Sequence, residues 1–468
     1  MTAPRIFLLI GILGAGTAVE TAYQVREHIG VGAFGWRLFG GKFYGPHHVF
    51  EEKALRAIEA GTPVFVKNAF GDVDVKAGSA GPVEILLRKD VYIGSEDKAR
   101  AFADRIRLQS ELVDGKLQIR TNREELEREK DAFDVGFETH FQLRLPAGTP
   151  VEIEGSHGQA DVEDAGETRV DNSHGDVRVR RVSAVRVNSS HGAVELETVR
   201  GAVLVDVRHG DATVRDAAGS VRVVSEHGAV SAQRVGALEV QLKYGDLQAD
   251  TLAGGLQVRG EHAGVEAKGV QGGADVETSY ADATLEDVGA DARVKVEHGA
   301  VVLARVKGSV TAESSFGDAR LEDVTGRAEL TVAHGGVRAK RVRGGFVART
   351  DGDDIVLDGF QGAVEAEAKR GSVRLTPEGP VAAGIDASAS FGNVRLQVPD
   401  GSRFDLVAQV ERGELRVTLP GLEISEQGKG RLLGRLGDGG PQVRLQAEHG
   451  DVRVSNRIAE SARSDDDE

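Results

Sequence analysis

The sequence predicts an all-β protein built as a single-stranded parallel β-solenoid, that is, a right-handed β-helix with coils of about 18 residues. Three observations support this prediction. Glycine makes up 61 of 468 residues, roughly twice the usual share of about 7%. A His, Tyr or Phe followed by Gly or Ala returns every 17 or 18 residues. Between these markers, short segments alternate Val with charged residues, which is the period of a half-buried strand.

The marker residues form a regular series, and a fixed period of this kind means that one structural unit is stacked many times. In one unit the alternating segments are Asp176-Val177-Arg178-Val179 and Val185-Arg186-Val187. Each unit therefore supplies two strands and two corners, and we expect the markers to form a structural ladder along one corner. The series consists of His157, His174, His191, His209, His227, Tyr244, His262, Tyr280, His298, Phe316 and His334.

The residue two places after the marker alternates between Asp and a small residue, so a second period of about 36 residues is present. Like charges on neighbouring strands repel, and alternation keeps the acidic residues two coils apart; we expect each to lie near a His of the next coil. A coil of 36 residues is the rival arrangement. The 18-residue coil places His334 beside Phe316, whereas the 36-residue coil places it beside His298. The acidic positions are Asp176, Asp211, Asp246, Asp282, Asp318 and Asp353.

The N-terminus predicts export. Arg5 precedes an apolar run from Ile6 to Val19, which is shorter than the roughly 20 residues of a membrane span and typical of a signal-peptide core. Residues 1–22 are therefore predicted to be a signal peptide or a retained anchor in the inner membrane, with a buried strand or helix as the alternative. Either form of export places the protein in the periplasm or at the cell surface.

The remaining chain divides into four segments. Residues 23–60 are predicted to be a linker, residues 61–145 a β-rich cap with a short helix, residues 146–456 the solenoid, and residues 457–468 a disordered acidic tail. Within the cap, we expect a helix over Asp97 to Arg105 after Ser95 as N-cap. A hairpin is expected at Asp114-Gly115, and a solvated loop over Asn122 to Asp131.

Several of these repeats resemble a known family. Gly175-Asp176-Val177, Gly245-Asp246-Leu247 and the closing Gly450-Asp451-Val452 are similar to the Gly-Asp-(Ile/Val) signature of the bacterial putative-adhesin family of β-strand repeats, a domain of unknown function. The resemblance covers roughly residues 60 to 456. It implies a signal or anchor before the solenoid and an interaction role at the cell envelope. The family usually has Ser where this chain has its His, Tyr or Phe markers.

Composition excludes several classes of function. The formal net charge of −16 argues against a nucleic-acid partner, which needs a basic face, and it favours a soluble monomer. Because the chain has no cysteine, disulfides, zinc-thiolate sites and thiol nucleophiles are impossible. The repeated His and Asp residues offer many equivalent places, whereas catalysis requires one unique place.

We therefore expect a non-enzymatic structural or interaction protein that binds an envelope polysaccharide or protein and carries no cofactor. The alternatives are a ligand- or metal-binding sensor of envelope stress and a glycan-active β-helix enzyme. We expect no metal site, because Tyr and Phe share the marker position with His and a packed ladder explains all three residue types. Were calcium to bind, the best single place would be the segment with Asp351, Asp353 and Asp354.

Overall fold

The computed structural model describes residues 46–79, 81–129 and 135–456 and confirms the all-β solenoid. The chain divides into two compact units, which meet between Ala160 and Asp161. The predicted signal or anchor, the first part of the predicted linker and the acidic tail lie outside the described residues. Among the helices that the structure describes, none has the length and apolar character needed to cross a membrane.

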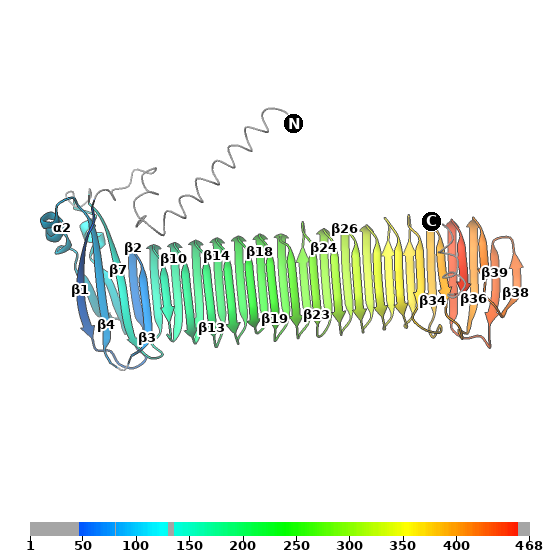
Figure 1. Ribbon diagram of the computed structural model, residues 1–468, viewed down its shortest axis with the longest axis horizontal. Helices are drawn as coiled ribbons and strands as arrows, with labels where there is room; N and C mark the ends of the chain where they lie inside the picture. The colour runs from blue at the N-terminus through cyan, green and yellow to red at the C-terminus, as the bar shows by residue number, and fades with distance from the viewer. Residues whose placement is uncertain (1–45, 80, 130–134, 457–468) are drawn as a thin grey trace, which may run out of the picture. The chain divides into compact units, whose positions relative to one another are not determined.

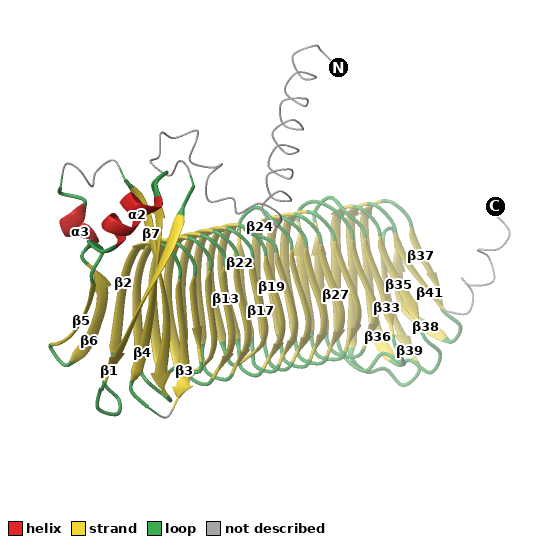
Figure 2. Cartoon of the chain, turned by 60° about the vertical axis from the view of Figure 1, so that its left-hand side comes forward, coloured by secondary structure: helices red, strands yellow, loops and turns green. Residues whose placement is uncertain are grey.

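Unit 2 is a parallel β-solenoid, within which each coil gives one strand to each of two sheets (Figures 1 and 2). The first sheet contains β11 (Val177–Val182), β13 (Val194–Val199), β15 (Ala212–Ala217), β17 (Val230–Val235), β19 (Leu247–Leu252), β21 (Val265–Val270), β23 (Ala283–Val288), β25 (Val301–Val306), β27 (Ala319–Val324), β29 (Val337–Val342), β31 (Ile355–Phe360), β33 (Val373–Pro377), β35 (Val394–Val398), β41 (Val452–Asn456) and β37 (Leu415–Thr418).

The second sheet contains β10 (Glu167–His174), β12 (Ala184–His191), β14 (Val203–His209), β16 (Val221–His227), β18 (Leu238–Tyr244), β20 (Leu256–His262), β22 (Ala274–Thr278), β24 (Ala292–His298), β26 (Val310–Phe316), β28 (Ala328–His334), β30 (Phe346–Thr350), β32 (Val364–Ala368), β34 (Ile385–Phe391), β40 (Gln442–His449), β36 (Phe404–Arg412), β39 (Arg431–Leu436) and β38 (Leu422–Gly428). β9 (Ala160–Glu163) lies at the boundary between the units.

The coil has 18 residues rather than 36. Phe316 and His334 are paired in register on neighbouring parallel strands, and so are His298 and Phe316. A 36-residue coil would instead have made His298 the neighbour of His334. Corresponding positions of successive coils therefore lie directly above one another, separated by the spacing of hydrogen-bonded strands, about 4.8 Å.

A thin apolar core fills the space between the two sheets of unit 2. In the first sheet most strands bury their first, third and sixth residues, as β25 does with Val301, Leu303 and Val306. The alternation shifts because the fifth residue, Arg305, has a left-handed backbone with φ of 55°. This residue turns the chain, so that two successive side chains point outward and a third apolar side chain returns to the core.

The described part of unit 1 combines antiparallel and parallel strand pairing with two short helices. Its elements are β1 (His48–Arg56), β2 (Val64–Phe70), β3 (Val73–Ser79), β4 (Val83–Tyr92), α2 (Glu96–Ala103), β5 (Leu108–Val113), β6 (Lys116–Thr121), α3 (Arg123–Leu126), β7 (Gly136–Pro146) and β8 (Val151–His157). β1, β4 and β7 pair antiparallel, and β7 then pairs parallel with β3. β2 lies between β6 and β8, with parallel pairing to both. Because β8 pairs with β2, the compact unit extends to residue 160 rather than ending at 145.

Three local predictions in unit 1 can be compared with the structure: a hairpin, a helix and the N-cap of that helix. The hairpin at Asp114-Gly115 is confirmed, since β5 and β6 pair antiparallel and both turn residues have positive φ, as a type I′ turn requires. The predicted helix begins one residue earlier and ends two residues earlier, at Ala103, with Ser95 in the N-cap position but without a side-chain capping bond.

Two other predictions were wrong in part. β1 occupies residues that were assigned to the linker. These residues form a strand because they pair with β4 along the whole length of β1. The predicted solvated loop over Asn122 to Asp131 contains the short helix α3, in which Arg123 and Leu126 are buried. Leu126 packs in a small core with Phe102 and Phe137. The prediction failed because the segment is highly charged apart from this one apolar residue.

At the C-terminal end of unit 2, the order of the strands in the sheets no longer follows their order in the sequence. β40 pairs on one side with β34 and on the other with β36, and β41 lies in the same way between β35 and β37. Beyond β36 the second sheet ends in antiparallel pairing with β39 and then β38, which are drawn in orange in Figure 1. The last coil of the sequence is therefore an internal coil of the stack.

We predict that Gly192→Ala destabilises unit 2 by about 1–3 kcal/mol. Gly192 has φ of 129°, and a Cβ there would lie 2.3 Å from the carbonyl oxygen of Gly175 in the preceding coil. Thermal and urea unfolding of both proteins measures the difference. Gly379→Ala is the matched control, because no atom lies within 4 Å of the added Cβ. Equal losses from the two substitutions would show that close coil contact is not the cause.

Candidate functional site

Ten marker side chains of unit 2 form one continuous stack along the corner that follows the second sheet. Ring centroids of neighbouring coils are 4.6–5.0 Å apart, and the planes are inclined by 0–27°. The stack runs from His174 to His334. Gly352 takes the next position, and Phe391 and His449 stack again at 4.8 Å nearer the C-terminal end. In unit 1, His157 stacks on Phe70 at 4.7 Å.

The stack presents ring edges to solvent, because the ring faces are covered by the neighbouring coils. All ten side chains are exposed; the exposed fraction is 54% for Tyr280 and 50% for Phe316. Imidazole nitrogens and tyrosine hydroxyls on such edges can donate and accept hydrogen bonds. The result is a row of polar and aromatic edges repeated at the coil spacing.

The acidic residues of this corner have a different role from the one expected. The carboxylate of each accepts a hydrogen bond from the backbone N–H two places after the marker in the next coil, at 2.7–3.1 Å. The pairs are Asp176 with Ala193, Asp211 with Ala229, Asp246 with Gly264, Asp282 with Ala300, and Asp318 with Gly336. The hydrogen-bond partner of each Asp is therefore a backbone N–H rather than a His side chain. The residue that donates it is Ala or Gly in these five coils.

The segment considered for calcium continues the same pattern. Asp354, not Asp353, is the capping residue, and it accepts the N–H of Ser372 at 2.7 Å. Asp353 accepts the N–H of Asp354 at 2.8 Å, and the Asp351 carboxylate pairs with Lys369 Nζ at 2.8 Å. These carboxylates are engaged in separate contacts and do not converge on one point.

A second ladder, which the sequence analysis missed, lies on the left-handed residues of the first sheet. From Asp287 to Arg341, acidic and basic residues alternate at this position over four coils. The guanidinium of Arg341 donates two hydrogen bonds to Asp323, at 2.5 and 2.9 Å, and it lowers the pKa of that carboxyl. Arg305 pairs with Asp287 in the same way. In the sequence, this ladder is visible as Glu-Asp-Val alternating with Arg-Val every 18 residues.

A groove of about 400 Å³ runs along this second ladder. It is lined by the paired Arg305 and Arg341 and by two further cations, Lys307 and Arg343. The carboxylates in the lining, Asp287 and Asp323, are already paired with arginines. The groove is therefore a weakly basic strip on a protein whose net charge is strongly negative.

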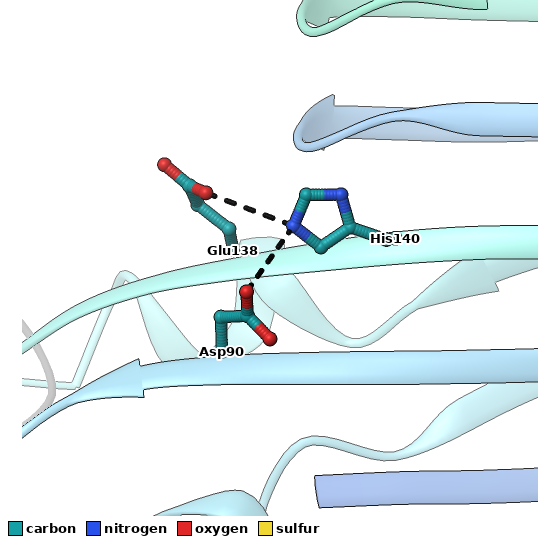
Figure 3. A group of neighbouring side chains, drawn as sticks. All are labelled: Asp90, Glu138 and His140. Carbon is teal, nitrogen blue, oxygen red and sulfur yellow. Dashed lines mark ion pairs between the residues drawn. The ribbon is translucent and has the colours of Figure 1, made fainter. Parts of the chain in front are cut away.

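A compact polar cluster in unit 1 is the third feature. His140 Nε2 lies 3.6 Å from Asp90 Oδ2 and 3.7 Å from Glu138 Oε2, and Figure 3 shows both carboxylates directed at the ring. Asp90 is 6% exposed and is held by two hydrogen bonds from Arg88, at 2.9 and 2.6 Å. On the other side of the ring, Asp72 Oδ2 lies 3.3 Å from Nδ1.

Burial and the charged groups of this cluster shift the pKa values of its members. Burial alone would lower the pKa of His140, but the carboxylates of Asp72, Glu138 and Asp90 outweigh it and raise the pKa to about 9. The contact with His140 lowers the pKa of Asp72. Burial, together with the charge of Glu138, raises the pKa of the Tyr92 hydroxyl. The sequence shows two spacing patterns at this cluster, Arg88-x-Asp90-x-Tyr92 and Glu138-x-His140. A spacing of two residues places the side chains on one face of each strand, but it does not show that the two strands pair.

The family assignment now follows. Residues 83–455 match the model of the Toastrack DUF4097 family, and the chain belongs to this family. The match confirms the resemblance to a β-repeat family of unknown function. Among curated proteins, none matches the sequence of this chain.

Two solved structures are similar to this chain at low identity. One is a putative cell adhesion protein from Clostridium sporogenes, with 8% identity and a TM-score of 0.20, covering 88% of this chain and all of the other. The other is a putative adhesin from Parabacteroides distasonis, with 13% identity and a TM-score of 0.15, covering 68% of this chain and 96% of the other. At such TM-scores the fold assignment rests on the strand pairing and on the family match.

We predict that Asp318→Ala lowers the free energy of unfolding by about 1 kcal/mol, the net value of one hydrogen bond. The substitution removes the acceptor for the Gly336 N–H. Asp318→Asn keeps an oxygen at the same place and should retain most of the stability. Chemical unfolding of the three proteins distinguishes the cap from simple charge effects, since both variants lose the charge.

A second prediction concerns pH. The folded-state pKa of His140, about 9, lies above its ordinary value of 6.5. The charged imidazole therefore contributes its full stabilisation below about pH 6.5, and the contribution is lost as the pH rises through about 9. Hydrogen exchange of β4 and β7 in wild type and His140→Gln, with a chelator present, should differ at pH 6 and converge above pH 9. A difference that persists at pH 10 would contradict the prediction.

Proposed function

We propose that this protein is an exported, non-enzymatic interaction protein of the cell envelope, adhesin-like in its mode of action, whose solenoid binds an envelope polysaccharide. The observation that carries the proposal is the continuous, exposed stack of rings from His174 to His334. Its repeated edges suit an extended ligand with a repeating structure better than a small substrate.

Repetition supports a polymer as the ligand for a physical reason. Each coil offers an edge that hydrogen-bonds weakly, and a ligand that engages several edges gains an effective concentration at every further one. The ring faces are covered, so sugar hydroxyls would meet nitrogen and hydroxyl groups on the ring edges rather than stack on open faces. The spacing of two coils is about 9.6 Å, which is comparable to the length of a disaccharide in an extended chain.

A non-enzymatic role is favoured by the same regularity. Each acidic residue of the ring corner caps a backbone N–H, and the groove along the second ladder holds carboxylates that are already paired with arginines. These carboxylates are poorly placed to act as the acid and base of glycan hydrolysis, which needs two carboxyl groups facing the scissile bond.

A sensor of envelope stress is the second candidate, and one observation favours it. The Asp90, Glu138 and His140 cluster of unit 1 is unique in the described chain rather than repeated. A unique site with a raised pKa for His140 could bind one ligand per molecule, which the ring stack would not.

Export and binding can be tested together. In a Gram-negative host, we expect the full-length protein in the periplasmic or membrane fraction, with the intact mass retained if the N-terminus is an anchor. The purified protein should co-sediment with isolated envelope polysaccharide. Replacing Tyr244, Tyr280 and Phe316, which occupy alternate coils of the stack, by Ser should weaken this binding at least tenfold, because three contacts of a multivalent surface are removed.

The control variant replaces three outward residues of the second sheet, Leu204, Arg222 and Gln241, by Ser. It alters the same number of exposed side chains away from the ring stack and should bind as the wild type does. Circular dichroism verifies that both variants remain folded. Equal binding by the two variants would exclude the ring stack as the binding surface, and intact protein in the cytosol would exclude an envelope role.

A further inference from the structure

The cluster in unit 1 is built on two paired strands. β4 and β7 are antiparallel, with Asp90 directly opposite Glu138 and Arg88 directly opposite His140. Like charges directly opposite each other are destabilising, so the carboxylates need a cation between them. The Arg88 guanidinium supplies part of that charge to Asp90, through hydrogen bonds to Oδ1 and Oδ2. The facing side is closed by the His140 ring (Figure 3).

The distances inside the cluster are too long for hydrogen bonds. His140 Nε2 is buried and has no hydrogen-bond partner, and its separations of 3.6 and 3.7 Å from the two carboxylate oxygens exceed the roughly 2.7–3.2 Å of an N–H···O bond. Bonds of about 2.0–2.2 Å to a tetrahedral metal ion would place its ligand atoms about 3.3–3.6 Å apart. The two separations from His140 Nε2 are therefore close to those of ligands that share one ion, and all three atoms lie within 4.8 Å of one another.

Charge favours a divalent ion at this place. With His140 neutral, three carboxylates, those of Asp72, Asp90 and Glu138, face a single guanidinium, which leaves two negative charges. Of the three, Asp90 is buried, and a buried carboxylate that lacks a sufficient counter-charge is costly. An ion of charge +2 would balance them, whereas a protonated imidazole balances only one.

The surroundings of His140 resemble those of a metal-bound histidine. The Asp72 carboxylate lies beside Nδ1, with Oδ2 3.3 Å away, and a tautomer with its proton on Nδ1 directs the lone pair of Nε2 at the two carboxylates. Asp72 is itself fixed, because its Oδ1 accepts the N–H of Gln159 at 2.8 Å. A carboxylate on the second nitrogen is the usual orienting partner of a metal-ligating histidine. In the other tautomer Nδ1 accepts the Asp72 N–H, 3.1 Å away, and Nε2 would not bind a metal.

We propose that Asp90, Glu138 and His140 form a binding site for one divalent transition-metal ion of the Zn²⁺ class. One imidazole nitrogen and two carboxylate oxygens suit Zn²⁺, whereas Ca²⁺ takes six to eight oxygen ligands. His140 is 20% and Glu138 29% exposed, so water can complete the coordination. The site shares no residue with the ring stack of unit 2, so this proposal and the proposed polysaccharide binding can be tested independently.

Calorimetric titration of the metal-stripped full-length protein with Zn²⁺ at neutral pH tests the proposal. We expect one saturable site per chain, with Mg²⁺ and Ca²⁺ failing to compete. Glu138→Gln is nearly isosteric and should weaken binding about 10–100-fold, and His140→Ala should abolish it. Titration with Co²⁺ gives a second readout, the visible absorption of a low-symmetry site, which should disappear in the same variants.

Exposed histidines of the ring stack could also bind Zn²⁺, and the control variant addresses them. In this variant His174, His191, His209 and His227 are replaced by Phe, which keeps the stack aromatic. It should retain the saturable site with unchanged affinity. The proposal is overturned if the wild type shows no saturable site, if binding survives both His140→Ala and Glu138→Gln in folded protein, or if the stack variant loses it.

Discussion

Parallel strands in exact register, one coil spacing apart, are the constraint on which unit 2 depends. Each residue has its own counterpart above and below it, at the distance of a hydrogen-bonded strand. A side chain is therefore tolerated only if it packs against, or bonds with, what occupies the same position of the next coil. Valine and alanine satisfy this inside, stacked rings satisfy it at one corner, and alternating Asp323 and Arg341 satisfy it on the left-handed residues.

The same constraint explains the period of 36 residues inside a coil of 18. Where a position carries charge, identical neighbours repel, and the chain alternates acid with base. Where Asp246 caps the N–H of Gly264 in the next coil, its charge is satisfied by the backbone, so the position above it needs no acidic or basic side chain. At the left-handed positions Asp287, Arg305, Asp323 and Arg341, two coils together are the smallest unit in which each charge has a complementary neighbour, so these positions repeat over two coils while the backbone repeats over one.

Much of the solenoid could be predicted from sequence, because ring, glycine and alternating valines recur in every coil and reinforce one another. The left-handed residue was missed, since Arg305 and Asp323 are ordinary strand-edge residues until their φ angles are known. The caps made by Asp318 and its counterparts were found as a pattern but given the wrong partner. The cluster at Asp90 and His140 could not be predicted, because pairing between β4 and β7 brings together residues about 50 apart that belong to no repeat.

The return of β40 and β41 to an internal position changes how unit 2 resists being pulled apart. A stack whose last strand lay at the edge could be unzipped from its C-terminus one hydrogen bond at a time. Here β40 is bonded to β34 on one side and to β36 on the other. A force on the chain beyond Asn456 acts first on β41, whose hydrogen bonds to β35 and to β37 must break together. The two inserted strands thus make unit 2 harder to unravel from this side than a stack with a free edge strand would be.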